Sequence, residues 1–207
     1  MARIGAPRQA RLCALEITVF NKIIFDMPQF IQVICCTRIL KAHEEACVIF
    51  EDGASSVIFS SQTSDYRHFE VEIPFSDLDW QVSSLEQVFT SCLPHFFTLE
   101  GLSIDVPKGW EPDWQDNVEN TLWLELSQPF TSVKNLFLSK EIAQLIVPAL
   151  QELVEGRRIE VLPARENIFL EGLELLGPVE KGIRPFVSMR EVTGHPVAVT
   201  RWDRNSL

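Results

Sequence analysis

Three stretches of this 207-residue chain, LEGLSID (99–105), VKNLFLS (133–139) and RENIFLE (165–171), repeat one pattern of apolar residues. Each stretch has apolar residues at its fourth and sixth positions. The first position is also apolar except in the third copy, where it is Arg165. The fourth positions, 102, 136 and 168, are 34 and then 32 residues apart, a spacing typical of strand-plus-helix repeats that cannot fold singly.

Strand-like and helix-like stretches alternate along almost the whole chain. Alternating apolar residues predict strands, and apolar residues at helical spacing after a capping residue predict helices. The predicted strands are 12–20, 46–50, 56–60, 68–74, 98–106, 133–139, 164–171 and 195–202. Three predicted helices are capped by Asp26, Asp79 and Asp116, and a fourth begins at Lys140. The last of these helices extends to Gly156, and Pro148 is expected to kink or split it.

A hairpin is predicted near residues 46–61. Asp52-Gly53 stands between two β-rich runs, which is the strongest short-range signal for a tight turn between antiparallel strands. We expect this extra strand pair to decorate the regular repeat.

Strands that follow one another through helical crossovers pair in parallel, so the alternation predicts a parallel sheet with helices. A doubly wound sheet would need continuous apolar strands, because helices cover both of its faces. Charged residues interrupt these strands at alternate positions instead, namely Glu16, Glu70, Glu72, Lys134, Glu166 and Glu171. We therefore expect one α/β domain over residues 1–207, a leucine-rich-repeat-like horseshoe of irregular repeats of about 30 residues with outer helices and one sheet face in water.

Composition excludes several classes of partner. The chain has 18 basic and 29 acidic side chains, a formal charge of -11, so it should repel nucleic acids and anionic membranes and attract a basic protein. No signal-peptide pattern follows the N-terminus, and no apolar run approaches the roughly 20 residues that span a bilayer. These features predict a cytoplasmic or nuclear protein.

The sequence shows no motif for catalysis, cofactor binding or metal binding. The glycines at 101, 109, 172, 177 and 182 are interpreted as single turn residues outside any phosphate-binding loop. The five cysteines lack metal-ligand spacing and are interpreted as buried free thiols. One alternative stays open, a hydrolase with a Cys or Ser nucleophile beside one of the histidines, His43, His68, His95 or His195.

Most of the chain resembles a large group of basidiomycete F-box and leucine-rich-repeat-like proteins, in their C-terminal repeat region. The segments that carry the resemblance are DMPQFIQVI (26–34), VIFEDGASSVIFSS (48–61), LDWQVSSLEQVFTSCLP (78–94), PFTSVKNLFLSKEIAQLIVPALQELVEGRRIEVLPARENIFLEGLELLGPVEKGIRPFV (129–187) and HPVAVTRWD (195–203). The resemblance implies non-enzymatic repeats that hold the substrate of a cullin ubiquitin ligase. The family's N-terminal F-box segment is not expected in this chain. A further alternative is therefore that the chain is a structural remnant of a longer F-box-like protein and has no binding partner.

The solvent-exposed face of the predicted sheet contains the first candidate binding site. If the leucines of the motif point into the core, Phe137 and Phe169 stand in register on the opposite face, about 4.8 Å apart. Lys134, Asn135, Asn167 and Glu171 surround them, and an aromatic pair with a polar rim is typical of protein-binding hot spots. The alternatives are that the two rings only stack on each other, or that a missing N-terminal segment covers them.

A second candidate is the acidic loop that contains Trp110 and Trp114. Two tryptophans among carboxylates could bind a basic peptide through cation-π contacts and ion pairs. The alternative is that both indoles fold back and anchor the loop.

The first strand is expected to form an incompletely covered end of the repeat stack. Solenoid ends expose core-like faces unless they are capped, and Leu12, Leu15 and Ile17 would lie at such an end. Self-association through this edge is therefore predicted.

Overall fold

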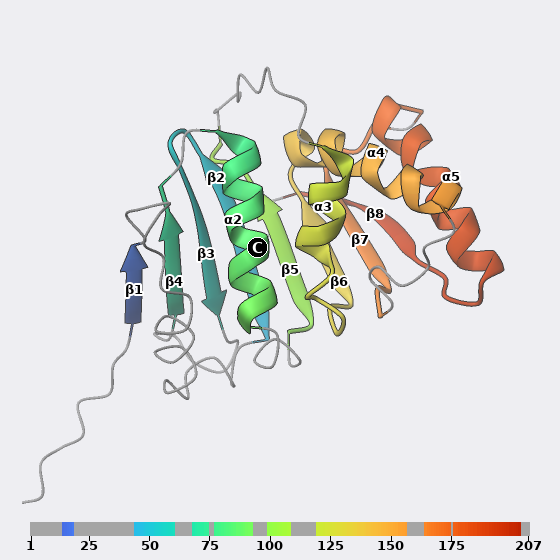
Figure 1. The fold of residues 1–207 in the computed structure, drawn as a ribbon. Coiled ribbons are helices and arrows are strands. Elements are labelled where there is room, and N and C mark those ends of the chain that lie inside the picture. Colours follow the sequence, from blue (N-terminus) through green and yellow to red (C-terminus); the bar gives the residue numbers. More distant parts are fainter. Residues whose placement is uncertain are drawn as a thin grey trace, which may run out of the picture.

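The computed structural model describes residues 14–18, 44–60, 68–74, 77–92, 99–108, 119–156, 164–174 and 176–203. These residues form one layer of strands and one layer of helices (Figure 1). The strands are β1 (Ala14–Thr18), β2 (Glu45–Glu51), β3 (Ala54–Ser60), β4 (His68–Ile73), β5 (Gly101–Asp105), β6 (Asn135–Leu138), β7 (Asn167–Glu171) and β8 (Ala198–Trp202). The helices are α2 (Leu78–Cys92), α3 (Asn120–Ser127), α4 (Lys140–Gly156) and α5 (Pro178–Val192).

The strands form a single mixed sheet in the order β1-β4-β3-β2-β5-β6-β7-β8. The predicted α/β class is confirmed, whereas the predicted parallel sheet is wrong because β3 runs antiparallel to both of its neighbours, β2 and β4. The predicted hairpin is present, with Gly53 at a φ of +82° in its turn. A two-residue turn forces antiparallel pairing of β2 and β3. Because β3 also pairs with β4, it lies inside the sheet and does not decorate it.

The strands from β5 to β8 follow one another in chain order, and each pairs in parallel with the next. Helices α3, α4 and α5 provide the three connections. One backbone pattern recurs at the start of these strands: the Glu100 carbonyl accepts N–H groups of Lys134 and Asn135, and the Lys134 carbonyl accepts those of Glu166 and Asn167, all at 2.9 Å. The spacing of 34 and 32 residues therefore corresponds to a repeated backbone geometry in this half of the sheet.

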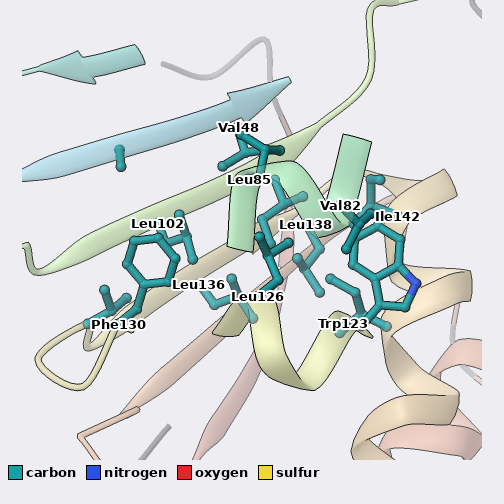
Figure 2. Close-up of a cluster of buried hydrophobic side chains, with 14 of the residues drawn as sticks. Val48, Val82, Leu85, Leu102, Trp123, Leu126, Phe130, Leu136, Leu138 and Ile142 are labelled. Carbon is teal, nitrogen blue, oxygen red and sulfur yellow. The ribbon is translucent and has the colours of Figure 1, made fainter. Parts of the chain in front are cut away.

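The apolar core lies between the sheet and the helices. In β2, β3, β6 and β7 the buried residues alternate with half-buried or exposed ones, and the register places these buried residues on the helix side. Figure 2 shows Val48, Leu102, Leu136 and Leu138 from the strands, packed against Val82, Leu85, Trp123, Leu126 and Ile142 from the helices. Within the described residues no helix packs on the opposite face of the sheet, which we call the uncovered face.

Several predicted boundaries differ from the structure. Helix α2 begins at Leu78, so Asp79 lies in its first turn and is not its N-cap. Helix α3 begins at Asn120 after Glu119, and Asp116 lies outside the described residues. Helix α4 has the predicted bounds and continues through Pro148, at an exposed position, without splitting.

Two glycines that the sequence pattern placed in turns lie in regular structure instead. Gly101 is the first residue of β5, and Gly182 lies in the second turn of α5. The predicted helix from Asp26 and the ends of the first predicted strand fall outside the described residues.

Candidate functional site

The two phenylalanines of the repeat motif lie side by side on the uncovered face. Phe137 on β6 is in register with Phe169 on β7, as the alternation predicts. Their rings stack with centroids 4.5 Å apart and planes 9° from parallel, and both side chains are half-buried. The stacked pair therefore forms an apolar surface on the uncovered face, to which each of the two strands contributes one ring.

Trp202 on the edge strand β8 packs against this pair of rings. Its indole meets the Phe137 ring edge-on, with centroids 5.4 Å apart and planes at 63°. The indole Nε1–H is buried and has no acceptor among the described residues. We call Phe137, Phe169 and Trp202 the aromatic cluster.

The sequence pattern predicted the strand that contains Trp202, but it did not identify this residue as part of a binding site. The register of β8 pairs Val199 with Ile168, and this register places Thr200 and Trp202 on the same face as Phe169. The Leu-x-Leu motif is absent from β8, so the sequence could not show which of its alternating residues face the core and which face away from it.

Some of the predicted polar residues lie around the aromatic cluster. The Asn167 Nδ2 donates a hydrogen bond to the Asn135 Oδ1 at 2.9 Å, one step before the phenylalanines along their strands. Glu171 occupies the uncovered face two residues beyond Phe169. Lys134 is half-exposed and forms a 3.1 Å ion pair with Glu100, which satisfies its charge within the chain. Trp110 and Trp114 lie outside the described residues.

All charged side chains at the strand positions of the uncovered face are acidic. Among the described side chains, these positions contain no lysine and no arginine. The acidic positions are Glu45, Glu51, Glu70, Glu72, Asp105 and Glu171. The face therefore combines an aromatic cluster with a field that attracts cations.

The described residues contain no arrangement for nucleophilic or metal-assisted chemistry. They hold no group of three metal-ligating side chains. His195 is exposed, His43 and His95 lie outside the described residues, and the side chain of His68 is not described. The hydrolase alternative therefore has no assembled site among these residues.

Cys47 is the one cysteine whose side chain is described, and its environment corrects a prediction. Its sulfur forms no disulfide and its side chain is only half-buried, because residue 47 faces away from the helices. The buried neighbours on β2 are Ala46 and Val48.

A small cavity of about 150 Å³ lies at the carboxyl end of β7, between the first turns of α4 and α5. Lys140, Gln144, Glu171 and Leu173 line it, together with two glycines, and its lining contains no Ser, Cys or His. The cavity has room for a few water molecules and lacks a candidate nucleophile.

Comparisons with protein-family models, with curated proteins and with solved structures found no match to this chain. In the described part of the chain, none of the helices has the length and apolarity that a membrane crossing requires.

Proposed function

We propose that this chain is a non-enzymatic protein-interaction module that binds a basic segment of a partner protein on the uncovered face of its sheet. In this proposal the succession of β5 to β8 is a leucine-rich-repeat-like solenoid, and the module corresponds to the substrate-recognition repeats of an F-box-type ubiquitin-ligase receptor. Such a receptor would act in the cytoplasm or nucleus.

The aromatic cluster is the observation that supports this proposal most directly. Binding energy at protein interfaces concentrates in a few aromatic residues that become fully desolvated, and Trp and Tyr are enriched there. Phe137 and Phe169 are half-buried on a face that no described helix covers, so a partner could complete their burial.

Charge determines the kind of partner. Every charged strand position described on this face is acidic, and the chain as a whole has a formal charge of -11. Complementary charge raises association rates and disfavours acidic competitors. A segment rich in Lys and Arg with an apolar anchor fits the face best.

A displayed library of random peptides tests the proposal. Peptides selected on the wild-type protein should carry net positive charge, and they should bind a Phe137→Ala/Phe169→Ala variant at least about tenfold more weakly. The matched control is Val192→Ala, which removes an apolar side chain that is 88% exposed at the end of α5, in the helix layer and not on the uncovered face. It should leave affinity unchanged.

Two results would contradict the proposal. Selected peptides without a basic bias would refute the charge argument. Equal affinity for the double variant and the wild type would exclude the aromatic cluster as the binding site and would favour a remnant without a partner.

A further inference from the structure

Charge and aromatic surface occupy different halves of the uncovered face. Five of its six acidic positions lie on β4, β2 and β5, namely Glu70, Glu72, Glu45, Glu51 and Asp105. The aromatic cluster lies on β6, β7 and β8, where Glu171 is the one acidic position among the described strand residues. The strand order separates the two halves, because β4 lies toward one edge of the sheet and β8 forms the other (Figure 1). A ligand that uses both halves must therefore extend across the strands.

One row of residues in register joins the two halves. From β4 to β7 the row passes through Glu70, Ile58, Cys47, Ser103, Phe137 and Phe169. All six side chains are half-buried on the uncovered face. Four strand spacings of about 4.8 Å separate Glu70 from Phe137, so the acidic end of the row lies about 19 Å from the aromatic pair.

The acidic end of this row suits long basic side chains. Glu72 lies two residues beyond Glu70 on the same strand and on the same face, so two acidic positions stand about 7 Å apart there. Ile58, in the row, and Ile49, beside it on β2, provide half-buried apolar surface next to these acids. Lys and Arg pack their methylene stems on such surface while the charged group stays near water and carboxylates.

We propose that the partner segment has two parts, an apolar anchor that covers the aromatic cluster and a group of Lys or Arg residues that reaches Glu70 and Glu72. This inference rests on the proposed function and adds the spacing of the two parts. An extended chain advances about 3.3 Å per residue, so about six residues separate the anchor from the basic group. The strands between the two ends pair on both sides, so the segment contacts them through side chains and not as an added strand.

Three synthetic peptides test the spacing. Each has a Trp-Leu anchor and three Arg residues, joined by two, six or ten prolines. Oligoproline is a semi-rigid spacer of about 3.1 Å per residue, so the three spacers measure about 6, 19 and 31 Å. Two linked contacts strengthen binding only when the linker matches the distance between their sites. In fluorescence anisotropy with the wild-type protein, the six-proline peptide should bind at least about fivefold more tightly than the other two.

Two double variants identify the acids that the basic group reaches. Glu70→Gln/Glu72→Gln should remove the advantage of the six-proline peptide and should change the affinity of the two-proline peptide by less than about twofold. The matched control, Glu152→Gln/Glu191→Gln, removes the same charge from exposed positions on α4 and α5 and should keep the advantage.

The outcomes for the two-part ligand and for the proposed function are distinguishable. Equal affinity of the three peptides for the wild type, or an advantage that survives in Glu70→Gln/Glu72→Gln, would overturn the two-part ligand and leave the proposed function standing. Absence of binding by all three peptides would also overturn the two-part ligand, and the displayed library would then decide about the proposed function separately. The wild-type comparison can overturn the two-part ligand even if the Gln variants fail to fold.

Discussion

At the scale of single residues, Arg165 departs most from the pattern around it. Buried arginine is stable in proteins when an acid or several carbonyls accept its N–H groups, and no described residue does so here. Two equivalent positions, Leu99 and Val133, show which residue type the core accepts at this place. The cost of Arg165 should therefore appear directly in measurements of stability.

Arg165→Val should stabilise the protein. Replacing a buried charge with a fitted apolar side chain removes its desolvation cost, and we expect the free energy of unfolding to rise by about 1–4 kcal/mol. Urea unfolding measures the change. Arg184→Val, at an exposed position of α5, should change it by less than about 0.5 kcal/mol. A less stable Arg165→Val protein would show that the guanidinium has a stabilising partner.

The stability difference between Arg165→Val and the wild type should also depend on pH. Burial lowers the pKa of Arg165 from its higher value in the unfolded chain to about 9 in the folded protein. Between these two values the unfolded chain binds more protons, so the stability of the wild type rises with pH by up to about 1.36 kcal/mol per unit. Below pH 9 both states are charged and the full cost is present.

Urea unfolding of both proteins from about pH 7 to about pH 10.5 checks this dependence. The advantage of Arg165→Val should be constant up to about pH 9 and should then shrink. A constant advantage across the whole range would mean that the folded-state pKa of Arg165 is not lowered.

At the scale of elements, the packing of α4 against α5 depends on a close approach at Gly182. A Cβ atom built on Gly182 would lie 2.6 Å from Cγ1 of Val147 on α4. The Gly182 carbonyl also accepts a hydrogen bond from Nε2 of Gln151 at 2.9 Å. The glycine lets the two helices approach each other closely, although it lowers the intrinsic stability of α5.

Gly182→Ala should destabilise the protein, in spite of the better helix propensity of alanine. The propensity gain is about 1 kcal/mol, and forcing Val147 aside costs about 1–3 kcal/mol, so we expect a net loss of about 1 kcal/mol. Chemical unfolding measures it. Ser188→Ala, at an exposed position of the same helix, should be neutral or slightly stabilising. A gain in stability for Gly182→Ala would show that α4 and α5 can move apart at little cost.

At the scale of the whole molecule, the sheet ends in two edge strands, β1 and β8. Each pairs with one neighbour among the described residues, β1 with β4 and β8 with β7. Unpaired edge groups template pairing with another chain unless charges or prolines block them. The predicted site of self-association therefore corresponds to the β1 edge, and β8 provides a second edge of the same kind.

Sedimentation velocity over a wide range of concentrations should reveal association of the isolated chain. Thr18→Lys places a charge on β1, at the position in register with Glu72 of β4, and should reduce the association. Arg184→Ala, on α5, should leave it unchanged. A clean monomer at every concentration would show that both edges are protected.

The sequence predicted those features that depend on local periodicity. The alternation in VKNLFLS and RENIFLE was enough to place Phe137 beside Phe169, because side chains alternate strictly along a strand and the repeat fixed the register of β6 against β7. The bounds of α4 followed from helical spacing in the same way. Where the motif is missing, as in β8, the cluster residue Trp202 could not be identified.

By itself the sequence determined the α/β class, the repeated units from β5 to β7 and the phenylalanine pair, since each depends on spacing within a few dozen residues. The tertiary structure alone decided that the β2–β3 hairpin lies inside the sheet, that Trp202 completes the aromatic cluster, and that Arg165 lies buried beside Arg190. These features depend on which distant segments pack together. Packing depends on the burial of the whole core, so no local sequence pattern predicts it.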